Sequence, residues 1–261
     1  MEKKESNLKT MDAYVKSEHH NGVTTIEFYH SQSNSLPARI LENLAQAIHS
    51  AGNDDDTRVI VLRSGGSKAF CAGASFDELV AIRTEQQGLD FFSGFAHVIN
   101  AMRKCPQFVI ARIHGKCVGG GVGIAAAADY AIATEAADIK LSELAIGIGP
   151  FVVGPVIERK TGLSAFSQLA IDATMWRNAD WARRKGLFAE LHTSDEAMDE
   201  SIRRLSETLT HANPVAMSDL KKTLWKGTEH WDNLLIERAA ISGRLVLSPF
   251  TRNAIAKFKT K

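Results

Sequence analysis

The sequence is poor in cysteine, in long apolar runs and in excess charge of either sign. Its 261 residues include 3 cysteines, Cys71, Cys105 and Cys117, and no CxxC pair occurs among them. A disulfide framework or a zinc site is therefore not expected, and the reducing cytoplasm is the predicted location. No apolar run approaches the length of a membrane span, and Met1 to Thr10 lacks the apolar core of a secretory signal. The sequence thus predicts no membrane association.

The charges nearly balance, since 31 Lys and Arg residues stand against 30 Asp and Glu residues, for a net charge of +1. This balance argues against a nucleic-acid binder, but it leaves open a local basic pocket for one phosphorylated ligand. The hydrophobic fraction of 44% and the charged fraction of 23% are ordinary for a soluble globular protein. A chain of this length can bury a large core, as one large domain or two small ones.

Strands and helices are predicted to alternate in the first part of the chain. Short runs of β-branched and aliphatic residues predict strands at 23–29, 59–62, 108–113 and 130–133. Apolar residues at helical spacing predict helices at 36–50 and 89–103. Ser35 is expected to cap the first of these helices, with Pro37 in its first turn. Repeated strand–loop–helix units predict an α/β layered fold.

From about residue 160 onward the strand signals fade and helical patterns take over. Helices are predicted at 162–173, 178–186, 195–211, 214–225 and 229–247. Residues 1–12 are expected to form a loose leader. The tail 251–261 carries Arg252, Lys257, Lys259 and Lys261 without an acidic residue. Two interpretations stay open for this tail: a solvated terminus, or a contact for a ligand phosphate.

A glycine-rich turn, Gly119-Gly120-Gly121, follows the strand predicted at 108–113 and opens a helix. The first N–H groups of a helix are unpaired and its dipole favours negative charge there, while glycine lets a ligand approach the backbone. Such a turn can hold a phosphate or stabilise an oxyanion, or it can serve only close helix packing. The motifs G-x-G-x-x-G, G-x-x-x-x-G-K-[ST] and G-x-S-x-G are absent. Neither a dinucleotide, a nucleoside triphosphate nor a nucleophile elbow is therefore expected.

A second small-residue loop, Cys71 to Ser75, lies between another predicted strand and a helix. Two such loops at neighbouring strand ends can each offer one N–H to the same oxygen, as a two-donor oxyanion hole does. Glu143 is the acid that stands out as a base, because it lies in an apolar stretch that raises a carboxyl pKa toward neutrality. A capped or salt-bridged structural Glu143 is the alternative. His114, Cys71 and Cys117 are interpreted as packing residues.

Four sequence marks occur in order: Asn34-Ser35-Leu36, the segment Lys68-Ala69-Phe70-Cys71-Ala72-Gly73-Ala74, Gly115-x-x-x-Gly119-Gly120-Gly121, and Glu143 ahead of Gly147 and Pro150. With them the chain resembles the crotonase (enoyl-CoA hydratase/isomerase) superfamily from about residue 12 to its end. The resemblance implies an α/β fold in which a spiral of repeated ββα units, residues 12–200, carries the acyl-CoA site. It also implies a C-terminal helical region, residues 201–261, that covers the site and assembles a homotrimer or a homohexamer.

The resemblance also assigns the site residues. The backbone N–H groups of Ala74 and Gly120 would form the oxyanion hole for the thioester oxygen, with Glu143 as the acid/base. The expected contacts to the acyl-CoA thioester are Lys68, Ala72, Gly73, Gly119, Phe258 and Lys259. No metal and no cofactor are expected, since coenzyme A is part of the substrate.

One departure from the family pattern bears on the reaction. Hydratases of the family carry two glutamates, and the position of the second, three residues after Gly120, is Gly123 here. Because hydration shares its base and its acid between that pair, the sequence favours isomerisation of a 3-enoyl-CoA to a 2-enoyl-CoA by Glu143 alone. Hydration, for example of methylglutaconyl-CoA, and decarboxylation of an acyl-CoA stay open as alternatives.

Two alternatives from other classes also stay open. A serine peptidase on the same fold needs a serine near the oxyanion turn, and residues 115–123 contain none. A CoA-binding scaffold subunit that has lost its activity would bind acyl-CoA without turnover. Ser75 stands where the family commonly has aspartate, a residue that usually braces the loop, and the role of Ser75 stays open.

Overall fold

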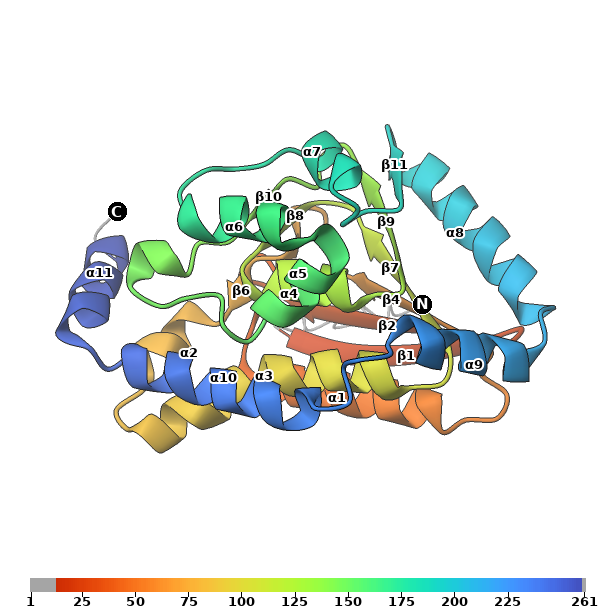
Figure 1. The fold of residues 1–261 in the computed structure, drawn as a ribbon. Coiled ribbons are helices and arrows are strands. Elements are labelled where there is room, and N and C mark those ends of the chain that lie inside the picture. Colours follow the sequence, from red (N-terminus) through yellow and green to blue (C-terminus); the bar gives the residue numbers. More distant parts are fainter. Residues whose placement is uncertain (1–12, 260–261) are drawn as a thin grey trace, which may run out of the picture.

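The computed structural model describes residues 13–259 (Figure 1). Its main sheet has the strand order β1-β2-β4-β7-β9-β11. Their bounds are β1 Ala13–His20, β2 Val23–His30, β4 Val59–Ser64, β7 Phe108–Ile113, β9 Tyr130–Thr134 and β11 Glu190–His192. β1 and β2 form an antiparallel hairpin, and every later pair of neighbours is parallel. The four strands predicted from sequence are confirmed.

β1 and β11 are the strands of this sheet that the sequence pattern does not predict. Most of β1 is exposed, and β11 consists of three half-buried residues. Neither segment therefore shows the apolar run or the alternation on which a strand prediction depends. Both strands lie at the edges of the main sheet.

Each inner strand of the main sheet leads to a short strand in one of two smaller sheets. β2 leads to β3 (Ser35–Leu36) and α1 (Ala38–Gly52), and β4 leads to β5 (Ala69–Cys71), β6 (Gly73–Ala74) and α2 (Phe76–Ala81). β7 leads to β8 (Lys116–Val118) and α4 (Gly120–Ala127), and β9 leads to β10 (Ile139–Lys140) and the short 3-10 helix η1 (Leu144–Ile146). The short strands pair in the orders β10-β8-β5 and β3-β6. This is the α/β spiral of ββα units that the resemblance implies.

The alternation of side chains along the central strands divides the core between the two faces of the main sheet. In β4, Ile60 and Leu62 belong to the larger core cluster, which α1 and α3 (Glu85–Lys104) complete. Val59 and Val61 belong to a smaller cluster that α8 (Asp195–Thr210) covers. Figure 1 shows α1, α3 and α10 (Trp231–Leu245) running side by side along one side of the molecule.

The remaining helices are α5 (Gly154–Thr161), α6 (Leu163–Ile171), α7 (Ala179–Arg184), α9 (Pro214–Leu224) and α11 (Pro249–Lys259). The five helices predicted after residue 160 are confirmed, as α6, α7, α8, α9 and α10. The sequence pattern does not predict α5, which begins with Gly154 and Pro155, or α11 in the tail. No helix within residues 13–259 is long and apolar enough to cross a membrane.

The predicted cap of α1 is wrong. The helix begins at Ala38 with Pro37 in the N-cap position, and Pro37 makes no side-chain cap hydrogen bond. The Ala38 N–H instead donates to Oε2 of Glu78 at 2.8 Å. Ser35 instead pairs with Gly73 in the ladder between β3 and β6, and its hydroxyl donates to the carbonyl of Ala74 at 3.3 Å. The segment before α1 is therefore a strand, and the Ser35 hydroxyl serves that ladder.

Candidate active site

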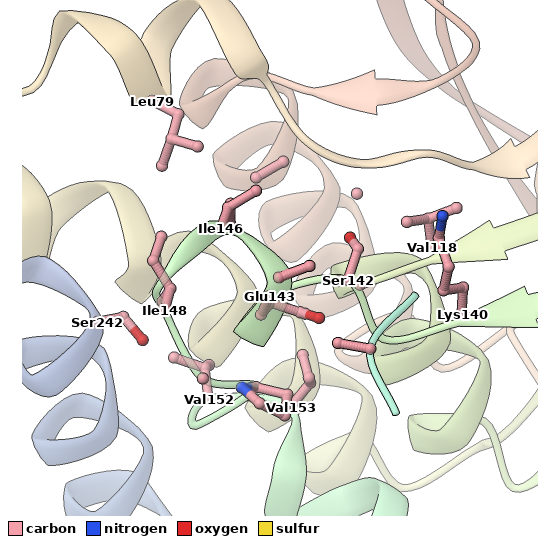
Figure 2. Close-up of a pocket in the computed structure, with 18 of the residues that line it drawn as sticks. Leu79, Val118, Lys140, Ser142, Glu143, Ile146, Ile148, Val152, Val153 and Ser242 are labelled. Carbon is pink, nitrogen blue, oxygen red and sulfur yellow. The ribbon is translucent and has the colours of Figure 1, made fainter. Parts of the chain in front are cut away.

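A pocket of about 490 Å³ lies where the short strands end. Most of its wall consists of apolar side chains from α2, α3 and the chain after Glu143. Figure 2 shows Glu143 in the middle, with Leu79 and Ser242 on one side and Val118 and Lys140 on the other. Of the described residues that line the pocket, only Glu143 and Lys140 have ionisable side chains.

The backbone N–H of Ala74 faces this pocket. The N–H of the next residue, Ser75, donates to the carbonyl of Leu36 at 2.9 Å, on the side of β6 that pairs with β3. Successive N–H groups of a strand point to opposite sides, so the Ala74 N–H points away from β3. Ala72, Gly73 and Ala74 all line the pocket. The Ala74 N–H is thus free to donate to a ligand.

Gly120, the second predicted donor, lies at the first turn of α4. The Gly119 N–H donates to the carbonyl of Lys140 at 2.9 Å, and the Gly119 carbonyl accepts from Val122 at 2.9 Å. The first residues of a helix have no acceptor within the helix for their N–H groups, which leaves the Gly120 N–H available. A Cβ built on Gly73 would lie 3.8 Å from the Gly120 nitrogen. The two loops therefore meet, as the sequence hypothesis of an oxyanion hole requires.

Glu143 stands over the same turn. It follows β10, and its carbonyl accepts from the N–H groups of Ile146 and Ile148 at 3.2 and 3.0 Å, which fixes the backbone around it. A Cβ built on Gly119 would lie 2.9 Å from the Glu143 Oε1. Gly119 has φ +52° and ψ −117°, a conformation that only glycine adopts readily. The turn thus needs glycine there both for its backbone and for the close approach of the carboxylate.

The surroundings of Glu143 raise the pKa of its carboxyl group. Burial raises its pKa from the ordinary value of 4.5 to about 7, and a hydrogen bond from its own backbone N–H opposes this only in part. Its Oε2 is buried and has no hydrogen-bond partner among the described residues. A carboxyl with a pKa near neutrality exchanges protons efficiently in both directions at physiological pH. The arrangement suits one group that removes a proton and then returns it.

The position of a second carboxylate is closed by packing. A Cβ built on Gly123 would lie 2.4 Å from Cγ1 and 2.7 Å from Cβ of Val153, the residue that precedes α5. Among the described residues, the wall thus has no second carboxylate, and Val153 leaves no room for one at position 123. Within residues 13–259, no group of three or more His, Cys, Asp or Glu side chains is placed to hold a metal ion.

The structure does not place three of the expected ligand contacts, Lys68, Phe258 and Lys259, in this pocket. Lys68 is exposed and does not belong to the lining. Phe258 and Lys259 fall in the last turn of α11, and their side chains lie outside the described part of the chain.

The other titratable candidates are packing residues, as the sequence suggests. Burial raises the pKa of the Cys71 thiol to about 12 and that of Cys117 well above its ordinary value, so neither is a nucleophile. His114 is buried outside the pocket, and burial together with Arg112 lowers its pKa. The Ser75 hydroxyl accepts from the Glu78 N–H and caps α2.

Lys140, Trp176 and Ser242 line the pocket although no sequence pattern points to them. Lys140 comes from β10, Trp176 from the loop between α6 and α7, and Ser242 from α10. These segments are far apart in sequence, and none of the three belongs to a local motif. The sequence signal that could have pointed to Lys140 is its position three residues before Glu143.

Comparisons with known proteins match this chain to one family model. Residues 18–257 match the family model described as enoyl-CoA hydratase/isomerase. The mouse mitochondrial methylglutaconyl-CoA hydratase is 29% identical over 200 residues, which span 75% of this chain and 63% of that protein. The Arabidopsis thaliana peroxisomal Delta(3,5)-Delta(2,4)-dienoyl-CoA isomerase is 27% identical over 214 residues, which span 76% of this chain and 75% of that protein. A hydratase and an isomerase are thus similar to the chain at nearly the same identity.

The fold has close counterparts among solved structures. The crystal structure of an enoyl-CoA hydratase from Bacillus halodurans superposes with a TM-score of 0.87 at 21% sequence identity. The superposition covers 94% of this chain and 99% of that one. At this identity the similarity concerns the fold.

Proposed function

Because this chain belongs to the enoyl-CoA hydratase/isomerase family of the crotonase superfamily, we propose that it moves the double bond of a 3-enoyl-CoA to the 2-position. Glu143 is the proposed acid/base, and the N–H groups of Ala74 and Gly120 are the proposed oxyanion hole. The substrate is the acyl-CoA thioester, and the reaction needs no further cofactor because only a proton and electron pairs within the substrate move.

The proposed reaction has two proton transfers. The ionised Glu143 carboxylate removes a proton from C2, and the electron pair delocalises over C1 to C4 and the thioester oxygen as a dienolate. The Ala74 and Gly120 N–H groups stabilise the negative charge that develops on that oxygen. The Glu143 carboxyl then returns the proton to C4, which leaves the double bond between C2 and C3 and restores the carboxylate.

The packing of Val153 beside Gly123 is the observation that favours isomerisation over hydration. Hydration needs one group to activate water and another to protonate the α-carbon, a task that two carboxylates share. The side chain of Val153 fills the space that a second carboxylate at position 123 needs. Isomerisation needs one carboxyl with a pKa near neutrality, and Glu143 has one of about 7.

The far end of the pocket supports an uncharged acyl chain as the substrate. Leu79 and Ser242 line this end, and Lys140, the one cation among the described lining residues, lies on the other side of Glu143 (Figure 2). The acyl group of methylglutaconyl-CoA ends in a carboxylate. Burying a carboxylate without a cationic partner is costly, so the apolar end favours a hydrocarbon chain over a dicarboxylic acyl group.

We also propose that the chain assembles as a homotrimer or a homohexamer. Large apolar side chains are exposed on the C-terminal helices, among them Leu163 and Ile171 of α6, Val215 of α9 and Phe250 of α11. Large apolar side chains exposed to solvent are typical of surfaces that another protein chain covers.

Product analysis by chromatography and mass spectrometry tests the proposed reaction. The protein is given a short unbranched 3-enoyl-CoA and, separately, the matching 2-enoyl-CoA. The first is expected to become a product of unchanged mass that co-elutes with the 2-enoyl-CoA, and the second is expected to gain no water. Addition of water to the 2-enoyl-CoA, faster than isomerisation of the 3-enoyl-CoA, would show that the protein is a hydratase and would contradict the proposal.

A further inference from the structure

Two lysines lie over one exposed tryptophan at the polar end of the pocket. The Nζ atoms of Lys140 and Lys116 are 4.6 and 5.0 Å from the centroid of the Trp176 ring. Trp176 is 38% exposed, Lys116 is exposed and Lys140 is half-buried. An ammonium group over an indole ring is held by the negative face of the ring. We call these three side chains the Trp176 cluster.

The geometry of the short strands makes the Trp176 cluster continuous with the pocket. Lys140 of β10 pairs with Val118 of β8, and paired residues of neighbouring strands point to the same face. Lys116 stands two residues before Val118 and therefore shares that face. Val118, Lys140 and Trp176 line the pocket, whereas Lys116 does not. The side chains of Val118, Lys140 and Lys116 thus form a row that leads outward from the glycine turn at Gly119. Lys116 is the outermost residue of this row.

No carboxylate within residues 13–259 forms an ion pair with either of the two ammonium groups, that of Lys116 or that of Lys140. A second pair of neighbouring cations in this chain, Arg103 and Lys104, shares the carboxylate of Asp232 at 2.7 and 2.8 Å. Two cations close together repel each other, and an anion between them removes that repulsion. The Trp176 cluster therefore has the charge and the accessibility that an anionic ligand needs.

We propose that Lys116 and Lys140, held on Trp176, bind a phosphate group of the coenzyme A portion of the substrate. The inference rests on the proposed function, because it takes the substrate to be a CoA thioester. Each end of the pocket then binds a different part of the substrate. The apolar end with Leu79 and Ser242 takes the acyl chain, and the end with Lys140 takes the long arm that carries the phosphates (Figure 2). Lysine binds phosphate as a point charge, without a fixed geometry.

A double variant tests the inference on substrates with and without phosphate. The variant Lys116→Gln/Lys140→Gln is compared with the unmodified protein on a 3-enoyl-CoA and on the pantetheine thioester of the same acyl group. The ratio of kcat/KM on the CoA thioester to kcat/KM on the pantetheine thioester is expected to fall about tenfold, which corresponds to about 1.4 kcal/mol. The double variant Lys116→Arg/Lys140→Arg, which keeps both charges, is expected to keep most of the ratio.

The matched control is Lys185→Gln. Lys185 is also an exposed lysine over an indole, with its Nζ 6.0 Å from the Trp181 ring centroid, but it lies outside the pocket. This variant is expected to leave the ratio unchanged. An unchanged ratio in Lys116→Gln/Lys140→Gln would overturn the inference and leave the proposed reaction standing.

Calorimetric binding of coenzyme A itself separates this inference from the proposed reaction, because it needs no turnover. The double glutamine variant is expected to bind coenzyme A about tenfold more weakly than the unmodified protein, and equal affinity would overturn the inference. The same comparison is made with dephospho-coenzyme A, which lacks the 3′-phosphate. If the double variant still loses affinity for it, the Trp176 cluster binds the pyrophosphate. If the two proteins bind it equally, the cluster binds the 3′-phosphate. An unmodified protein that binds coenzyme A but isomerises no enoyl-CoA would overturn the proposed reaction alone.

Discussion

Replacing Glu143 by Gln is expected to lower kcat for 3-enoyl-CoA isomerisation by about 10³-fold, because a positioned acid/base contributes about 10²- to 10⁴-fold. Glutamine has nearly the same shape but can neither take the C2 proton nor return it. The fold is expected to persist, since the buried Oε2 has no hydrogen-bond partner among the described residues and the substitution removes a carboxylate that burial destabilises. Steady-state kinetics on a 3-enoyl-CoA, with calorimetric binding of coenzyme A beside it, measures both effects.

The control for this variant is Glu42→Gln, which changes an exposed glutamate on α1, far from the pocket lining. It is expected to keep the activity of the unmodified protein. Coenzyme A is expected to bind Glu143→Gln with nearly unchanged affinity, because the carboxylate contacts the acyl group. Near-normal turnover by Glu143→Gln would refute its role as the acid/base.

Replacing Gly119 by Ala is expected to lower kcat/KM by about 10²-fold, since a misplacement of about 1 Å in a catalytic group costs that much. The added Cβ meets the Glu143 Oε1 at 2.9 Å and pushes the carboxylate away from the substrate. Alanine is also strained at φ +52° and ψ −117°, at a cost of about 1–3 kcal/mol. Kinetics and denaturant unfolding of the same preparation separate the loss of activity from the loss of stability.

The matched control for Gly119→Ala is Gly162→Ala. Gly162 has φ +81° before α6, and a Cβ built on it meets nothing within 4 Å. This control is expected to carry the backbone strain without the contact to a catalytic group, so its free energy of unfolding falls while kcat/KM stays near normal. Equal loss of activity in the two variants would assign the effect of Gly119→Ala to instability, and the account of the turn would be wrong.

The candidate acid/base was predictable because its signal is local. Glu143 lies in an apolar stretch of sequence, and an apolar environment raises a carboxyl pKa whatever the details of the fold. The glycine triplet likewise carries its own signal, since Gly119 needs a positive φ and a close approach. The resemblance to the family then joined these two segments to Ala74, which no local pattern relates to them.

Features that depend on packing across the fold were not predictable. Val153 packs against Gly123, which lies 30 positions earlier in the chain. No periodic pattern in the sequence predicts this contact. The Trp176 cluster likewise joins β8, β10 and the loop before α7. Such contacts follow from the arrangement of the ββα units, which the sequence pattern gives only in outline.

The wrong prediction for Ser35 has a similar cause. Its neighbour Asn34 is buried, and the Asn34 amide donates to the carbonyls of Gly65 and Ala69 at 2.8 and 2.9 Å. These hydrogen bonds hold the segment against the chain near β5, where Ser35 enters a strand. A serine before a helical pattern is ordinarily a sound cap signal, and here distant hydrogen bonds override it.

The most direct test of the single-carboxyl mechanism follows one hydrogen through the reaction. A 3-enoyl-CoA deuterated at C2 is converted in ordinary water, and the product is analysed for deuterium at C4. If Glu143 removes and returns the same hydrogen, part of the deuterium is expected at C4, because its Oε2 has no hydrogen-bond partner among the described residues to carry the deuteron away. A product that carries only protium at C4 would contradict this account of a shielded carboxyl that returns the same hydrogen, since water or a second group would then supply the C4 hydrogen.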